Sequence, residues 1–88
     1  MAIPRKLTAN FVATEVDDET LIVDLDGGFL FSLSGTARTV WHAIDGVSDA
    51  ALIAESMAIA HDGDVRLIAD DIHELLSDLE RAALVELV

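Results

Sequence analysis

Three histidines are the residues of this chain best suited to acid–base or metal chemistry, because imidazole titrates near neutral pH and binds transition metals. They are His42, His61 and His73, on three separate predicted segments, so no two have the four-residue helical spacing of a zinc-binding pair. The chain also has no cysteine to complete such a site. His73 beside Asp70 or Glu74 could meet an ion, but solvated helix positions explain these residues better. We therefore predict no metal site.

Paired carboxylates could also perform acid–base catalysis, since two acids in one cleft can have well-separated pKa values. The pairs here are Asp17-Asp18, in a predicted turn, and Asp70-Asp71, on a predicted helix surface, and neither place offers a cleft. No serine lies in a Gly-x-Ser-x-Gly elbow, and Asp26-Gly27-Gly28 lacks the Gly-Lys-Ser/Thr that continues a phosphate-binding loop. We predict that the protein is not an enzyme and holds no cofactor.

The charge balance narrows the possible partners. Among 88 residues, 17 are acidic and 5 are Lys or Arg, which gives a formal net charge of −12. Such a chain repels nucleic-acid phosphates and anionic lipid surfaces, to which Lys and Arg supply much of the affinity. No stretch approaches the roughly 18 apolar residues of a membrane span, and the N-terminus lacks the apolar run of a secretory signal. We expect a cytoplasmic protein without nucleic-acid or membrane partners.

Three segments in the first part of the chain have the composition and alternation of β-strands. Phe11–Val16 is rich in aromatic and β-branched residues, while Leu21–Leu25 and Phe29–Leu33 alternate with a period of two. Asp17–Glu19 forms a turn between the first two, and Asp26–Gly28 supplies the glycines that a tight hairpin needs. These spacings predict an antiparallel three-stranded meander.

Three helical patterns follow the strands. The first has Ser34 or Thr36 as its predicted N-cap and Gly46 as the residue just after its end. Ser48 is the predicted N-cap of the second helix and Asp64 that of the third. The three apolar stripes consist of Ala37, Val40, Trp41 and Ile44; of Leu52, Ile53, Met57 and Ala60; and of Val65, Ile68, Ile72, Leu75, Leu76 and Leu79.

This order of elements predicts an α+β fold, with a three-stranded antiparallel N-terminal sheet followed by three helices. The same element set occurs in winged-helix-like domains. Residues 1–10 lack periodicity and are predicted as an N-terminal tail, and residues 11–88 as a single domain. The segment Leu84–Val88 fits either an extension of the last helix or a short strand.

An ordered set of motifs spans residues 11–85: the strand LIVDL, the turn DGG, Leu33-Ser34, Thr36-Ala37, Trp41, Asp45-Gly46, Asp71-Ile72, Leu75-Leu76, Leu79 and Leu84-Val85. This set resembles the PqqD-like family, the precursor-peptide recognition domains of ribosomal peptide natural-product pathways. Two positions depart from the family pattern: Ser34 stands where Asn is usual, and Ala83 stands where Gly is usual.

The resemblance implies a non-catalytic binding module. In this family the leader segment of a precursor peptide adds as a strand to the third strand of the sheet, and the third helix forms the other wall of the groove. Backbone groups would supply affinity and side-chain pockets selectivity. The implied peptide-binding residues are Phe29, Leu30, Phe31, Ser32 and Leu33 on the strand, and Leu67, Ile68, Asp71, Ile72, Glu74 and Leu75 on the helix. The spacing of Phe31, Leu33 and Trp41 assigns their side chains mainly to the core.

Asp71 and Glu74 could meet cationic residues of a leader, although a solvated helix face explains them equally well. The resemblance also implies a maturation enzyme as partner, either a radical SAM enzyme or the leader peptidase and cyclase of a lasso peptide pathway. The alternative is a winged-helix DNA-binding regulator. The net charge opposes that alternative, because the third helix carries one cation, Arg66, before Arg81.

Overall fold

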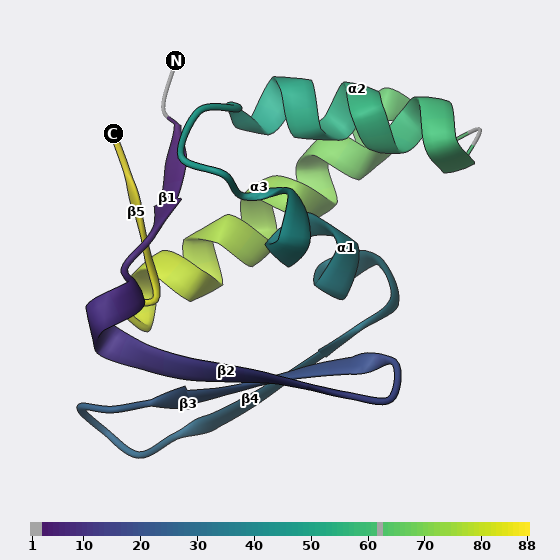
Figure 1. The fold of residues 1–88 in the computed structure, drawn as a ribbon. Helices are drawn as coiled ribbons and strands as arrows, with labels where there is room; N and C mark the ends of the chain where they lie inside the picture. The colour runs from purple at the N-terminus through teal and green to yellow at the C-terminus, as the bar shows by residue number, and fades with distance from the viewer. Residues whose placement is uncertain (1–2, 62) are drawn as a thin grey trace.

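The helices of this chain cover one face of its main sheet (Figure 1). The computed structural model describes residues 3–61 and 63–88. It confirms the predicted α+β class, with a three-stranded antiparallel sheet and three helices. In chain order the elements are β1 (Pro4–Lys6), the 3₁₀ turn η1 (Thr8–Asn10), β2 (Phe11–Val16), β3 (Glu19–Asp24), β4 (Leu30–Ser34), α1 (Gly35–Ala43), α2 (Ala50–His61), α3 (Val65–Arg81) and β5 (Val85–Leu87).

The main sheet is the predicted meander, with the strand order β2-β3-β4. Glu19 lies opposite Ser34 across the β3–β4 pair, and the register continues without a break to Val23 opposite Leu30. Gly28 closes the hairpin with φ of 73°, a left-handed conformation that costs glycine little because it has no Cβ. This turn determines where β4 begins and which of its residues face the helices.

A second, two-stranded sheet joins the two ends of the chain. Pro4–Lys6, which falls in the predicted N-terminal tail, is instead the strand β1 and pairs antiparallel with β5 (Figure 1). Residues 1–2 of that tail lie outside the described residues. The open prediction for Leu84–Val88 resolves as a strand, because Ala83 turns the chain out of α3 with φ of 60°. A three-residue strand has no periodicity to detect, and its partner lies at the other end of the sequence.

The ends of α1 differ from the prediction. Ser34 is the N-cap by position, but its side chain makes no capping hydrogen bond. The helix ends at Ala43, so Gly46, with φ of 80°, lies in the connection to α2 and not directly after the helix. The Asp45 carboxylate closes this connection by accepting from the amides of Ser48, at 2.7 Å, and Val47, at 2.9 Å. These two backbone hydrogen bonds lower the pKa of Asp45.

The start of α2 is a second correction. Asp49, not Ser48, caps this helix, because the Asp49 carboxylate accepts from the amide of Leu52 at 2.8 Å. Both residue types cap helices well, and the sequence alone did not separate the two neighbours. Asp64 caps α3 as predicted and accepts from the amide of Arg66 at 2.9 Å.

The core lies between the inner face of the sheet and the helices. Trp41 is buried at its centre, in edge-to-face contact with Phe11 at 5.2 Å between ring centroids. The buried stripe of α2 starts at Ala50, so the predicted Leu52 and Ala60 are exposed. Val65, in the first turn of α3, is also exposed. The buried hydrophobic residues are Phe11, Ile22, Leu33, Val40, Trp41, Ile44, Ala50, Ile53, Ala54, Met57, Ile72, Leu76, Leu79, Leu84 and Val85.

Candidate functional site

β4 is an outer strand of the main sheet, so one side of its backbone has no neighbouring strand in the described structure. The amide of Asp24 donates to the carbonyl of Phe29 at 2.9 Å, which establishes the phase of the β3–β4 pairing. Backbone groups alternate in direction along an antiparallel strand, so Phe31 bonds to β3 as Phe29 does. Leu30 and Ser32 therefore direct their N–H and C=O groups away from β3. We call this row of free groups the β4 edge.

A cavity of about 240 Å³ lies between α1 and α3, and we call it the α1–α3 cavity. Its α1 side begins at Thr36, two residues after the last residue of β4, so the chain passes directly from the strand into the cavity lining. The side chain of Ile72 is fully buried and contributes to the apolar wall of this cavity. The lining residues are Thr36, Ala37 and Val40 from α1, and Asp71, Ile72 and Leu75 from α3.

The five predicted strand residues divide between the two faces of the sheet. Leu30 is 64% exposed and Phe29, in the turn before β4, is 68% exposed, while Ser32 is exposed as well. Leu33 is buried in the core and Phe31 packs against it, as their spacing predicted. A peptide at the β4 edge could pair with the outward backbone groups of Leu30 and Ser32, but it would touch few of the inward side chains.

The six predicted helix residues also divide. Asp71, Ile72 and Leu75 come together in the α1–α3 cavity. Ile68 is half-buried beside the core, and Leu67 and Glu74 are exposed on α3 outside the cavity lining. The structure thus brings half of the predicted helix set into one concave site, whose α1 side follows β4 in the chain. Leu67 and Glu74 remain predictions.

The α1 side of this cavity is not among the predicted peptide-binding residues. The sequence predicts Thr36 as a helix cap, and Ala37 and Val40 as part of the core stripe of α1. Val40 does lie in the core, and Ala37 packs against it. The sequence around Thr36, Ala37 and Val40 fits ordinary capping and core positions and carries no signal of a cavity.

The surface around the site is acidic, because most of the basic side chains are engaged elsewhere. Arg5 pairs with Glu86, and Arg38 donates to Glu15 at 2.7 Å. Lys6 lies over the ring of Trp41 at 4.6 Å from its centroid, and its pKa is lowered by burial against an opposing effect of Glu15. The exposed carboxylates of Asp71 and Glu74 therefore lie in a field that favours cationic ligands.

A polar cluster around Glu15 ties β2, β3 and α1 together. The carboxylate accepts from the hydroxyl of the fully buried Thr20, from Arg38, and lies 3.0 Å from Nε2 of His42. The hydrogen bond from Thr20, followed by those from Arg38 and His42, lowers the pKa of Glu15 to about 2 against an opposing effect of burial. The described residues contain no group of His, Asp and Glu side chains that could hold a metal ion. We assign the cluster to stability.

The family model for coenzyme PQQ synthesis protein D (PqqD) matches residues 19–85. This chain belongs to the PqqD family. Among solved structures, TbiB1 in complex with the TbiA(beta) leader peptide is similar with a TM-score of 0.81 and 21% sequence identity, covering 92% of this chain and 94% of that one. At this identity the similarity establishes a shared fold. No curated protein gives a significant match to the chain.

One departure from the PqqD pattern has a structural consequence. Ala83 occupies the place of the usual Gly and has φ of 60°, in the region that glycine adopts without strain. The side-chain amide of Asn10 donates to the carbonyl of Ala83 at 2.9 Å and holds this turn. Ala83 therefore holds a left-handed conformation that glycine, the usual residue here, would adopt without strain.

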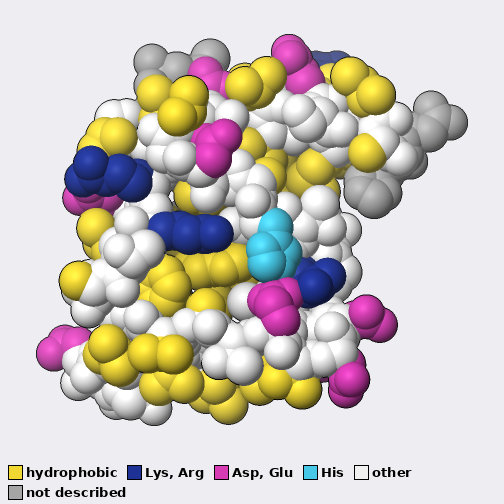
Figure 2. All heavy atoms as spheres, in the orientation of Figure 1, with side chains coloured by type: hydrophobic (Ala, Val, Ile, Leu, Met, Phe, Trp, Pro, Cys, Tyr) yellow, Lys and Arg dark blue, Asp and Glu magenta, His cyan; other side chains and the backbone are white. Residues whose placement is uncertain are grey.

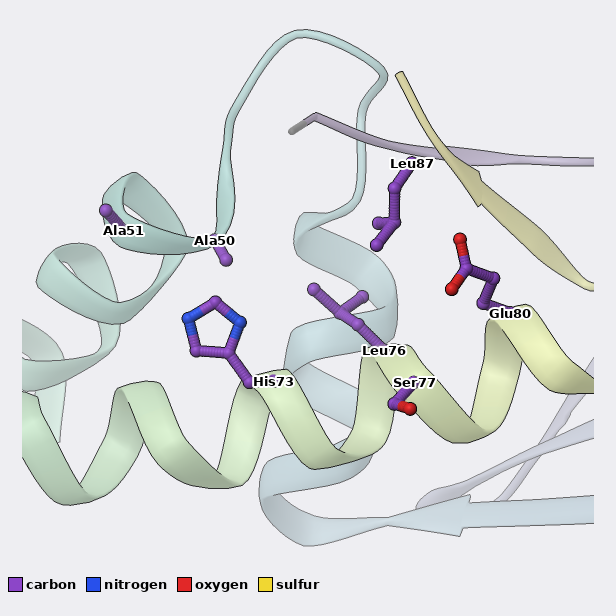
Figure 3. Close-up of a pocket in the computed structure, with 7 residues that line it drawn as sticks. All are labelled: Ala50, Ala51, His73, Leu76, Ser77, Glu80 and Leu87. Carbon is purple, nitrogen blue, oxygen red and sulfur yellow. The ribbon is translucent and has the colours of Figure 1, made fainter. Parts of the chain in front are cut away.

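A second cavity of this PqqD domain, about 370 Å³ in volume, lies between α2, α3 and β5. His73, Leu76 and Glu80 extend from α3 toward the start of α2 and toward β5, and Ser77 lies on α3 between Leu76 and Glu80 (Figure 3). None of the predicted peptide-binding residues lines it. It lies on a different side of α3 from the α1–α3 cavity, because its α3 residues project in a different direction around the helix axis from Asp71, Ile72 and Leu75. No helix among the described residues has the length and apolarity that crossing a membrane requires.

Proposed function

We propose that this chain binds the leader segment of a ribosomally synthesised precursor peptide by strand addition to the β4 edge, with side chains of the leader anchored in the α1–α3 cavity. The observation that supports this proposal is the continuity of the two features: free backbone groups at Leu30 and Ser32, and a cavity that starts two residues beyond β4. Membership of the PqqD family and the leader peptide bound to TbiB1 agree with it.

Backbone pairing alone gives little net affinity. Leu30 and Ser32 each offer one donor and one acceptor at the β4 edge, and four hydrogen bonds contribute roughly 2–6 kcal/mol in total. Ordering a disordered segment costs roughly 2–5 kcal/mol. One apolar side chain buried in the α1–α3 cavity adds about 1.5–3 kcal/mol. The cavity is therefore the part of the site that turns a weak, sequence-blind contact into selective binding.

The carboxylates of Asp71 and Glu74 add an electrostatic preference. Asp71 lines the α1–α3 cavity and Glu74 is exposed one turn further along α3. A leader with Lys or Arg beside its apolar anchor would gain affinity from both carboxylates. The net charge of −12 would also raise the association rate of such a leader.

In this proposal the chain performs no reaction of its own. It holds the leader in the cytoplasm and presents the rest of the precursor to a maturation enzyme, either a radical SAM enzyme or the leader peptidase and cyclase of a lasso-type pathway. A domain that orders only the leader leaves the core segment of the precursor free for chemistry elsewhere. This division of labour is consistent with a site that offers backbone groups and apolar wall.

The DNA-binding alternative has no specific observation in its favour. Of the two Arg residues on α3, Arg81 pairs with Asp78, and the exposed face of the helix carries several carboxylates. A mobility-shift assay with random duplex DNA at low salt tests this alternative directly, and we expect no shift.

The proposed function is tested by titrating the protein with the leader half of the short open reading frame that neighbours its gene. We expect saturable binding by isothermal titration calorimetry, with weaker binding for Leu75→Ser in the α1–α3 cavity. Leu52→Ser on α2 is the matched control, because Leu52 is exposed and lies outside the cavity. The absence of binding to a correctly folded protein would exclude the proposal.

A further inference from the structure

The outer face of the main sheet carries an uncovered apolar row. Val12, Val23 and Leu30 lie opposite one another across β2, β3 and β4, and are 53%, 39% and 64% exposed. Ile22, the neighbour of Val23, is fully buried on the inner face. Figure 2 shows hydrophobic side chains gathered along the underside of this sheet, away from the helices. In a chain of net charge −12, an exposed apolar row of this kind indicates a surface that binds a partner.

One carboxylate accompanies this row. Among the outward positions of the three strands, all of which the structure describes, Glu19 is the only charged residue. The hydroxyl of Ser32 donates to Oε2 of Glu19 at 3.3 Å, so the Glu19 side chain leans from β3 across β4. The negative charge of Glu19 therefore lies over β4, the strand that carries the free edge.

A strand added to the β4 edge continues the pleat of the sheet. Residues of the leader opposite Leu30 and Ser32 would share their hydrogen bonds, and their side chains would point to the outer face. The residue between those two would point inward, toward the helices. The added strand therefore extends the Val12–Val23–Leu30 row by one side chain and brings another beside the Glu19 carboxylate.

We infer that the leader is selected on both faces of the sheet: besides its inward anchor, it carries a large apolar residue that covers Leu30 and, two positions away, a Lys or Arg that meets Glu19. This inference rests on the proposed function and specifies its ligand as an extended peptide with the outward pattern apolar–x–basic. Leu30 complements the apolar residue of that pattern, and the Glu19 carboxylate complements the basic one. A maturation enzyme or a second copy of the chain would not require this spacing.

The experiment is a selection from a random peptide library displayed on phage, with the full-length protein as bait. We expect the wild type to enrich peptides with the outward pattern apolar–x–Lys or apolar–x–Arg. Glu19→Lys should replace the basic preference by Asp or Glu, and Leu30→Thr should remove the apolar preference. Glu55→Lys on α2 and Val12→Thr on β2 are matched controls, because they make the same changes away from the β4 edge.

Affinities of one enriched peptide give the quantitative check. Glu19→Lys should weaken binding of an apolar–x–Lys peptide about fivefold at low salt, as expected for exchanging an exposed attraction for a repulsion. Leu30→Thr should weaken it by up to about fivefold, the scale of a cross-strand pair. Enriched peptides whose pattern is identical for wild type, Glu19→Lys and Leu30→Thr would overturn this inference and leave the proposed function intact. No enrichment by the wild type would remove both. A change of oligomeric state in Leu30→Thr without a change in peptide pattern would assign the row to a second copy and also overturn the inference.

Discussion

Ser32→Pro should weaken leader binding at the β4 edge without unfolding the protein. The amide of Ser32 points away from β3, so proline removes no hydrogen bond of the existing sheet, and an edge strand tolerates it. The incoming leader loses one hydrogen bond, worth about 0.5–1.5 kcal/mol, and its own carbonyl is left unpaired at a cost of about 1–3 kcal/mol where water is excluded. A total near 2 kcal/mol corresponds to about a 30-fold higher Kd.

Ala13→Pro is the control for this prediction. The outer edge of β2 has the same alternation, and the amide of Leu25 donates to the carbonyl of Asn10 at 2.9 Å, which leaves the amide of Ala13 pointing away from β3. Both substitutions thus remove one outward amide, at opposite edges of the same sheet, while Ser32→Pro also removes the hydroxyl that donates to Glu19.

Fluorescence anisotropy with a labelled leader peptide measures both variants, and circular dichroism with thermal unfolding checks that each is folded. The reasoning predicts a large loss for Ser32→Pro and unchanged affinity for Ala13→Pro. Equal losses in the two variants, or no loss in a folded Ser32→Pro, would refute strand addition at the β4 edge.

Three further predictions concern stability and charge. Ala83→Gly should raise the free energy of unfolding by about 0.5–1 kcal/mol in urea denaturation, because glycine relieves the left-handed strain at this turn despite its greater freedom when unfolded; a destabilised variant would contradict this. Glu15 has a folded-state pKa of about 2 against an ordinary value of 4.5, so its contribution is complete above pH 4.5 and lost as pH falls toward 2. Glu15→Gln should therefore flatten the fall of Tm between pH 5 and pH 2 relative to wild type, and parallel Tm curves would argue against the cluster. Asp71→Asn should lower the affinity for a cationic leader by about two- to fivefold at low salt and by less at high salt. A loss of affinity that does not depend on salt would indicate an effect of packing instead of charge.

Local patterns predicted the parts of the fold that depend on neighbouring residues. The meander followed from period-two alternation and from the Asp26–Gly28 turn, and α3 followed from its stripe and the Asp64 cap. The α2 stripe was displaced because its composition is apolar on several sides, so periodicity alone does not choose the buried face. The cap of the same helix was ambiguous for a similar reason, since Ser48 and Asp49 are adjacent and equally suitable.

Features that depend on distant parts of the chain were not predictable in this way. β1 exists because Pro4–Lys6 meets β5 at the other end of the sequence. The α1–α3 cavity requires two helices to lie at a particular separation, which neither stripe specifies. The Glu15 cluster joins residues of β2, β3 and α1, and nothing in the sequence around Glu15 distinguishes it from the other carboxylates.

The division of the site into backbone and side chains also determines how selectivity can arise. Every extended peptide offers the same hydrogen bonds to Leu30 and Ser32, so the β4 edge cannot distinguish one leader from another. Discrimination must come from side chains that the pleat directs alternately inward, to the α1–α3 cavity, and outward, to Leu30 and Glu19. Each contact is weak when taken alone, but inward and outward contacts depend on the same register. A leader shifted by one residue would exchange the two sets and lose both, so a small domain with one short edge strand can still select a register as well as a sequence.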